Sequence, residues 1–188
     1  MKEKNIQYFK NRSEWRKWLK KNYKKETEVW LRYFYKKTGK IRIEYGVAVE
    51  EALCFGWIDG VINKIDEESF MQRFTPRREK SNFSQLNRER LKMLVENNQV
   101  MPEVEKKFED ILSEEFIFPE DILEKIKEDK EVWKNFKKFS PGYKRIRVYY
   151  INIVRKTPEE FSKRLNNFIQ KTKENKKIKG VGGTDKYY

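Results

Sequence analysis

The apolar positions of this chain follow two periods, and the change between them divides the sequence. In the first 75 residues, side chains alternate over residues 58–65 and 70–75, which predicts an antiparallel pair of strands. Residues 28–36, whose two alternating faces both carry aromatics, predict a central strand. Residues 41–45 are predicted to be extended, and a helix is predicted from Gly46 to about Phe55. From Ser84 onward, apolar residues recur every three or four positions, a spacing typical of amphipathic helices. We therefore expect an α+β fold, with a small antiparallel sheet in the N-terminal half surrounded by helices and a C-terminal helical subdomain.

The same pattern predicts how the chain is divided. We expect an α+β part over residues 1–118, which carries the candidate site, and a basic helical subdomain over residues 119–178. Pro119 opens that subdomain at a first-turn position, where a missing backbone N–H costs nothing. After it the periodicity is lost and the chain becomes rich in glycine, so residues 179–188 are predicted to be a flexible tail.

Composition narrows the possible chemistry. Only 37% of the residues are hydrophobic and 39% are charged, but 15% are aromatic, and large rings can build a core from few residues. The chain has no histidine and one cysteine, Cys54, which excludes histidine bases, histidine-ligated metals and internal disulfides. We expect no cofactor, no metal and no catalytic residue. An enzyme that uses Asp59 and an arginine or lysine is the alternative that we rank last.

Two further expectations concern membranes and assembly. No apolar run approaches the roughly 20 residues that a membrane span requires, so we expect a soluble, cytoplasmic protein without a span. The sequence does not predict an oligomeric state.

The net charge of +14 is concentrated near the C-terminus, where residues 140–180 hold twelve Lys or Arg and three Glu. Such helices could contact nucleic acid phosphates or an acidic protein, or simply form a solvated surface, and the sequence does not separate these hypotheses. The candidate phosphate contacts are Lys144, Arg145, Arg147, Arg155, Lys156, Lys163 and Arg164.

The best candidate site combines a strand and a loop. On a strand, Trp57 and Asp59 project to the same face, so an aromatic platform could lie beside a carboxylate. Pro76 stiffens the loop that carries Arg77, close to the N-terminus of the helix from Ser84, and arginines beside a helix N-terminus favour anions. The candidate ligand contacts are Trp57, Asp59, Arg73, Thr75, Arg77, Arg78, Lys80, Ser81, Ser84 and Asn87.

Each half of this site has a purely structural alternative. Trp57 could be a core residue beside a surface Asp59, because Asp-Gly is an ordinary hairpin signal. Arg77 and Arg78 could pair with Asp59 or Glu67 and only hold the loop in place.

Two stretches of this region resemble the YdeI/OmpD-associated family, an OmdA-like family of bacteriocin-protection type. One is Glu-Ala-Leu-Cys-Phe-Gly-Trp-Ile-Asp-Gly from Glu51 to Gly60. The other is Phe-Thr-Pro-Arg-Arg from Phe74 to Arg78, continued by Lys80, Ser81, Ser84, Asn87 and Arg90. The basic segment from Tyr143 to Arg164 is similar to a second segment of the family. Phe83 stands where the family usually has tryptophan, and Glu160-Phe161 where it has Thr-Arg.

The resemblance implies more about fold and site than about chemistry, since no settled reaction comes with the family. Together with the residues, it favours a non-catalytic binding or stress-protection protein. Its ligand would be an anionic small molecule, such as a nucleotide-like one, in a cleft lined by Trp and Arg. The alternatives are a nucleic-acid-binding protein that uses the basic C-terminal helices, and the enzyme mentioned above.

Overall fold

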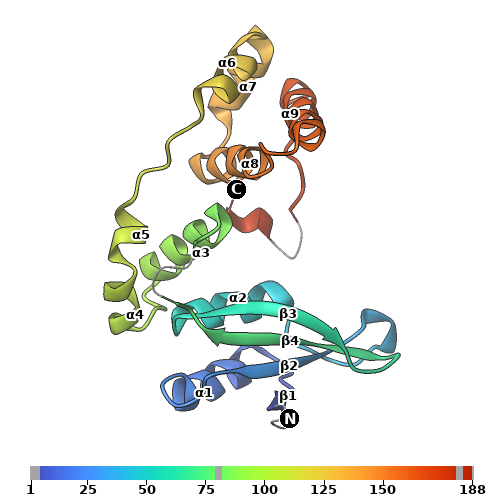
Figure 1. The fold of residues 1–188 in the computed structure, drawn as a ribbon, viewed down its shortest axis with the longest axis vertical. Helices are drawn as coiled ribbons and strands as arrows, with labels where there is room; N and C mark the ends of the chain where they lie inside the picture. The colour runs from blue at the N-terminus through green and yellow to red at the C-terminus, as the bar shows by residue number, and fades with distance from the viewer. Residues whose placement is uncertain (1–4, 79–81, 181–183, 188) are drawn as a thin grey trace. The chain divides into compact units, whose positions relative to one another are not determined.

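The computed structural model describes residues 5–78, 82–180 and 184–187 of the chain, which divides into two compact units (Figure 1). The first unit is formed by Met1–Asn82 with Arg90–Leu112, and the second by Phe83–Glu89 with Ser113–Tyr188. The division passes through α3 (Gln85–Glu96). Each unit is described by itself below.

The first unit contains a four-stranded sheet in the order β1-β2-β4-β3. Its strands are β1 (Ile6–Gln7), β2 (Val29–Phe34), β3 (Trp57–Lys64) and β4 (Ser69–Pro76). β4 pairs antiparallel with β2 and β3, as predicted, whereas β1 pairs parallel with β2. The α+β class is therefore confirmed, but the sheet is mixed, because a two-residue strand is too short to show an alternating pattern.

α1 (Arg12–Asn22) and α2 (Tyr45–Cys54) supply much of the core around this sheet. The indole ring of Trp15 packs edge-on against Phe74 of β4 at 5.6 Å, and its N–H donates to the Ala48 carbonyl at 3.0 Å. Because Trp15 is completely buried and its polar atom is bonded, it joins α1, α2 and the sheet without leaving an unpaired donor.

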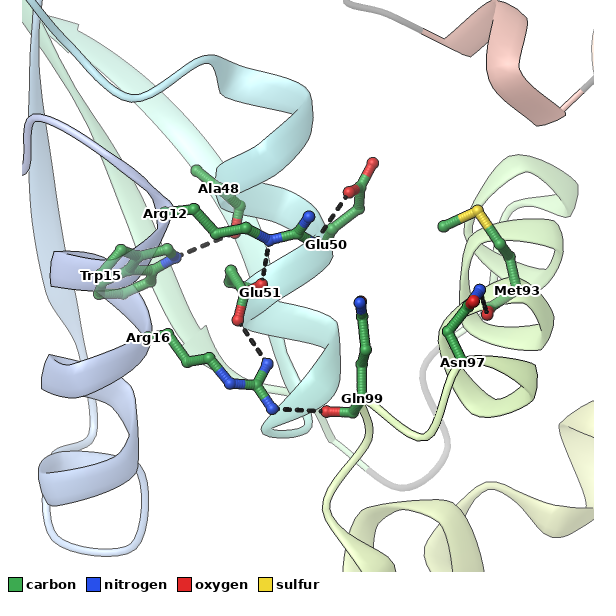
Figure 2. A network of polar contacts seen from close by, with 9 residues as sticks. All are labelled: Arg12, Trp15, Arg16, Ala48, Glu50, Glu51, Met93, Asn97 and Gln99. Carbon is green, nitrogen blue, oxygen red and sulfur yellow. Dashed lines mark hydrogen bonds and ion pairs between the residues drawn. The ribbon is translucent and has the colours of Figure 1, made fainter.

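Two buried glutamates on α2 hold α1 in place (Figure 2). The side chains of Glu50 and Glu51 are 1% and 2% exposed, and Arg12 reaches both of them. Arg16 binds Glu51 at 2.7 Å and also donates to the Gln99 carbonyl at 2.8 Å. Since each buried carboxylate has a cationic partner, the network satisfies groups that would otherwise be costly to bury.

A glycine makes the turn from α2 into β3. Gly56 has a φ of +72°, a left-handed conformation that favours glycine at the end of a helix. Its N–H donates to Leu53 at 3.0 Å, and its carbonyl accepts from the Arg77 N–H at 2.8 Å. The rest of this unit consists of η1 (Lys36–Thr38), α4 (Pro102–Lys107), most of α5 (Glu109–Ser113) and the later residues of α3.

The second unit is helical, as the apolar spacing predicts. Its main helices are α6 (Glu120–Lys127), α7 (Lys130–Lys138), α8 (Pro141–Asn152) and α9 (Pro158–Lys173). They share one core of aliphatic and aromatic side chains, in which Tyr143 is completely buried. Because Tyr143 also receives a hydrogen bond from the Ile178 N–H at 2.9 Å, this core extends to the chain beyond α9.

The described residues near the C-terminus contain one short element. η2 (Thr184–Tyr187) forms a short 3₁₀ helix, and the Gly180 N–H donates to Asp185 at 2.7 Å. Tyr187 is 8% exposed. A Cβ atom at Gly142 would lie 2.5 Å from the Tyr187 carbonyl oxygen, so α8 accepts this segment only because position 142 is glycine.

Candidate functional site

The polar groups of the first unit that are best placed for a ligand surround Asp59, a half-buried residue of β3. One carboxylate oxygen, Oδ2, accepts hydrogen bonds from the Tyr45 hydroxyl at 2.8 Å and the Gln72 amide at 3.1 Å. Among the described residues, no hydrogen bond reaches the other oxygen, Oδ1. The Asp59 side chain is thus held in a fixed orientation with one acceptor still available.

Strand register explains why these residues meet. Asp59 lies opposite Phe74 of β4, and Gln72 follows two residues along, so all three project from the same face of the sheet. Just beyond Asp59, a register shift between Asp59 and Ile62 marks a β-bulge, a feature that often redirects side chains beside a site. Tyr45 is the first residue of α2, which brings its hydroxyl to the same place.

Tyr33 of β2 adds a buried hydroxyl to this group. Its side chain is 0% exposed and stacks on Phe70, with ring centres 5.2 Å apart. Among the described residues, its hydroxyl has no hydrogen-bond partner. Burial raises the pKa of the Tyr33 phenol, and the nearby Tyr45 and Asp59 raise it further. A buried hydroxyl without a protein partner is uncommon, and a bound water or ligand is the ordinary explanation.

Arg42 places a cation beside the same ring. Its guanidinium lies 5.8 Å from the centre of the Tyr33 ring and 6.0 Å from that of Phe70. Within the described part of the chain, no carboxylate forms an ion pair with Arg42. The site therefore has a free positive charge as well as the carboxylate of Asp59. We call Arg42, Tyr33, Tyr45, Asp59 and Gln72 the Asp59 cluster.

Electrostatics keep the Tyr45 phenol protonated. Burial raises its pKa to about 12, and the Asp59 carboxylate contributes in the same direction, while Arg90 opposes the shift. A phenol with this pKa remains a donor at neutral pH and does not act as a base. Tyr45 therefore anchors Asp59, and the cluster is arranged for hydrogen bonding more than for proton transfer.

The structure corrects the predicted role of Trp57. This indole is 1% exposed, packs edge-on against Trp18 at 6.0 Å, and donates its N–H to the Tyr23 carbonyl at 3.1 Å. It cannot form an open stacking platform because α1 covers it. The structural alternative, a core tryptophan two residues before an accessible carboxylate, describes β3 correctly.

Arg77 also lies inside the unit and not on an open loop. It is 4% exposed, and its guanidinium donates to the Asn82 carbonyl at 3.2 and 3.3 Å. Burial lowers the pKa of Arg77, and the nearby Asp59 carboxylate opposes that shift. Arg77 therefore holds the loop, and the Asp59 carboxylate stabilises the charge of Arg77. Arg78, the next residue, is exposed.

The remaining predicted contacts belong to different parts of the chain. Arg73 projects from the opposite face of the sheet, where it pairs with Glu28 at 2.7 Å, and Thr75 shares that face. Lys80 and Ser81 lie outside the described residues. Ser84 and Asn87 belong to the second unit, where the Asn87 N–H donates to the Ser84 hydroxyl at 3.3 Å.

In the second unit, most of the predicted phosphate-binding arginines have carboxylate partners. Arg145 makes two bonds to Glu89 at 2.6 and 2.7 Å, and Arg155 makes two to Asp121 at 2.8 and 3.0 Å. Arg164 pairs with Glu160 at 2.8 Å.

The other predicted phosphate contacts differ. Arg147 donates to the Ile178 carbonyl at 2.6 Å. Lys156 and Lys163 are exposed, and Lys144 lies 5.5 Å from the Phe136 ring centre. Of the seven, Lys144, Lys156 and Lys163 form no ion pair with a described residue.

Sequence reasoning missed several members of the Asp59 cluster. Tyr33 was one of several aromatics on a strand, and Arg42 and Tyr45 lay in a segment predicted to be extended. The usable signal was the alternation of β4, which places Gln72 among the apolar Phe70 and Phe74. A polar residue on a buried strand face needs a partner, and that partner is Asp59.

The cysteine thiol and the potential metal ligands of the described chain do not point to a second site. Cys54 is completely buried, and burial raises the pKa of its thiol to about 11. The described residues contain no group of three metal-ligating His, Cys, Asp or Glu side chains. None of the helices in the described part of the chain has the length and apolar character needed to cross a membrane.

Comparison with known families divides the chain into two matches. Residues 7–107 match a family described as a domain of unknown function (DUF8412), and residues 115–175 match the family described as Bacteriocin-protection, YdeI or OmpD-Associated. The second match confirms the resemblance noted in the sequence, whereas the stretches around Asp59 and Arg77 fall within the first. Neither the curated proteins nor the solved structures gave a match.

Proposed function

We propose a function from the premise that this chain belongs to the family described as a domain of unknown function (DUF8412) and carries a Bacteriocin-protection, YdeI or OmpD-Associated segment. On that premise, we propose a non-catalytic binding protein of the cytoplasm. Its N-terminal unit holds a small anionic ligand at the Asp59 cluster. The role in protection that the second family's description names would then depend on occupation of this site.

The observation that carries this proposal is the Tyr33 hydroxyl. It is fully buried, without a hydrogen-bond partner among the described residues, and close enough to Asp59 and Tyr45 for their charges to affect its pKa. Leaving a buried hydroxyl unpaired costs about 1–3 kcal/mol. Because the hydroxyl is fully buried, a ligand reaches it only when the side chains that cover Tyr33 move apart. A polar group that then bonds to Tyr33 and to Oδ1 of Asp59 removes that cost, which favours binding.

The charges of the cluster indicate the class of ligand. Asp59 requires hydrogen-bond donors, and Arg42 attracts an anion to the neighbouring edge of the same sheet face. A molecule with amino or amide donors at one end and a phosphate or carboxylate at the other satisfies both. Nucleoside monophosphates have this arrangement, so the nucleotide-like ligand predicted from the sequence is retained, although the stacking residue assigned to it is not.

Binding is supported over the two alternatives by specific contacts. Acid–base catalysis needs a group poised near neutral pH, and the raised pKa of Tyr45, about 12, does not supply one. Nucleic acid binding needs cations available for phosphate, but Arg145, Arg155 and Arg164 are paired with carboxylates. Lys144, Lys156 and Lys163 are the predicted contacts left to support that alternative.

Thermal unfolding in the presence of AMP, GMP, CMP and UMP tests the proposal. At about 100 times Kd, a ligand that binds only the folded state stabilises it by about 2.7 kcal/mol, which raises Tm by several degrees. We expect at least one nucleotide to do so, with inorganic phosphate and ribose 5-phosphate giving smaller shifts because they lack the donors for Asp59.

Two variants separate binding from folding. Asp59→Asn and Tyr33→Phe should each abolish the ligand-induced shift while the free protein still unfolds cooperatively. Asp66→Asn is the control, because Asp66 is an exposed carboxylate at the other end of the β3–β4 hairpin. If no nucleotide shifts Tm, or if Asp66→Asn removes the shift as fully as Asp59→Asn, the proposed site is wrong.

A further inference from the structure

The second unit has its own hollow, separate in sequence and chemistry from the Asp59 cluster. A groove of about 520 Å³ runs along α8, within the range of about 300–1,000 Å³ that small-molecule sites occupy. Its apolar walls are formed by Leu86, Ile146, Tyr149, Tyr150, Ile153 and Ile178. A smaller hollow next to it shares Tyr150 and Ile178 with this α8 groove.

The walls of the α8 groove are open apolar surface. Tyr150 and Ile153 are 49% and 52% exposed, which is unusual for large side chains that lie within one turn of each other. Arg164 fixes the Tyr150 ring, since its guanidinium lies 3.9 Å from the ring centre and donates to the Tyr150 carbonyl at 2.8 Å. The groove wall is therefore held in shape before anything binds.

The charged residues around the groove have one sign. Arg147 and Lys179 line the groove and Arg164 the adjoining hollow, and no Asp or Glu is among the described residues that line either one. Lys179 is exposed and forms no ion pair with a described residue. Apolar walls with cations at one rim are complementary to a molecule that has an apolar body and an anionic head.

We propose that the α8 groove binds an amphiphilic organic anion, with its alkyl chain along Tyr150 and Ile153 and its carboxylate beside Lys179 and Arg147. This site lies in the other unit from the Asp59 cluster, and the inference does not depend on the nucleotide proposal. Affinity comes from burial of the alkyl chain, and the cations select the charge of the head group.

Isothermal titration calorimetry of the full chain with monomeric dodecanoate tests this site. We expect saturable binding, with octanoate roughly 100-fold weaker because four methylene groups fewer are buried. Dodecyltrimethylammonium, which has the same chain and the opposite charge, should bind at least about tenfold more weakly than dodecanoate. Asp59→Asn should leave dodecanoate binding unchanged, so that failure of this site and of the nucleotide site can be told apart.

Matched variants locate the binding. Lys179→Glu and Ile153→Asp should each weaken dodecanoate binding by roughly fivefold or more. Lys138→Glu and Ile117→Asp are the controls, since both residues are exposed and lie outside the groove, and Ile117 is 86% exposed. Both control variants should bind dodecanoate as the wild type does.

Several results would overturn the inference. They are the absence of saturable binding, equal binding of the ammonium compound, or equal loss of affinity in the control variants. The remaining alternative is a membrane surface. If anionic phosphatidylglycerol vesicles bind in a manner that depends on Lys179 and Ile153 while monomeric dodecanoate does not, the groove is a lipid-surface contact and not a ligand site.

Discussion

Two fully buried tyrosines, one in each unit, differ in whether their hydroxyl groups have a hydrogen-bond partner. Tyr143 in the second unit is 0% exposed, and its hydroxyl accepts a hydrogen bond from the Ile178 N–H at 2.9 Å. Tyr33 in the first unit is also 0% exposed, but its hydroxyl has no hydrogen-bond partner in the described part of the chain. The Tyr143 hydroxyl is bonded within its own unit. The Tyr33 hydroxyl bonds to no described residue and could bond to a ligand.

The difference is informative because several other buried polar groups of the first unit have partners. Glu50 and Glu51 are buried and both are bound by arginine, and the Trp15 and Trp57 indoles both have carbonyl partners. The unpaired hydroxyl is therefore not a sign of loose packing. Tyr33 shares this departure from the pairing of buried polar groups with Thr172 of the second unit, whose buried hydroxyl also bonds to no described residue. What distinguishes Tyr33 is its place beside Tyr45 and Asp59, which raise its pKa further than burial does alone.

The largest effect should come from breaking the buried network that makes the first unit so well satisfied. Glu51→Gln removes the charge that Arg12 and Arg16 share, and we expect a loss of about 2–3 kcal/mol in the free energy of unfolding. Asp121→Asn breaks a pair whose side chains are 47% and 54% exposed, and should cost less than about 1 kcal/mol. Urea unfolding at pH 7 measures both. Similar losses would mean that burial does not distinguish the two pairs.

A smaller effect, opposite in the two units, is expected from removing one hydroxyl at a time. Tyr143→Phe should cost about 1 kcal/mol, because it leaves the Ile178 N–H without its acceptor. Tyr33→Phe removes an oxygen that bonds to no described residue, so the free protein should be unchanged or slightly more stable. If Tyr33→Phe destabilises the protein as much as Tyr143→Phe does, the Tyr33 hydroxyl has a structural partner and the comparison fails.

The smallest effect is a shift in an alkaline titration. The pKa of Tyr45 is raised to about 12 by burial and then by Asp59, so this phenol keeps its proton when an unfolded tyrosine, with a pKa near 10, has lost it. The resulting stability is present below pH 10 and is lost as the pH rises toward 12. In Asp59→Asn, the Tyr45 pKa should fall but stay above 10, because burial remains. Ring-carbon NMR of Tyr45 measures this, and an unchanged pKa would contradict the contact.

Much of the fold could be predicted from the sequence, because strands and helices require different spacings between the apolar residues that face the core. Alternation identified β2, β3 and β4, and the central position of β2 followed from aromatics on both of its faces. The helix predicted from Gly46 to about Phe55 is α2, which begins one residue earlier, at Tyr45. β1 was not predicted, because a strand of two residues has no local pattern and depends on its pairing with β2.

The site was predicted less well, for reasons of geometry. Asp59 was found because it is polar on a strand next to a glycine, but Trp57 and Arg77 were assigned to an open cleft although both are buried. Whether an indole or a guanidinium is accessible depends on which helix covers it, and α1 is distant in sequence from β3. Tyr33 and Arg42 could not be assigned, because their proximity to Asp59 exists only after the strands have paired.

The most direct test of the central claim is the structure of the protein crystallised with the nucleotide that raises Tm most. We expect density for that nucleotide within hydrogen-bond distance of both the Tyr33 hydroxyl and Oδ1 of Asp59, with its phosphate toward Arg42. A Tyr33 hydroxyl bonded to a protein group, or a nucleotide bound elsewhere while the Asp59 cluster holds none, would contradict it.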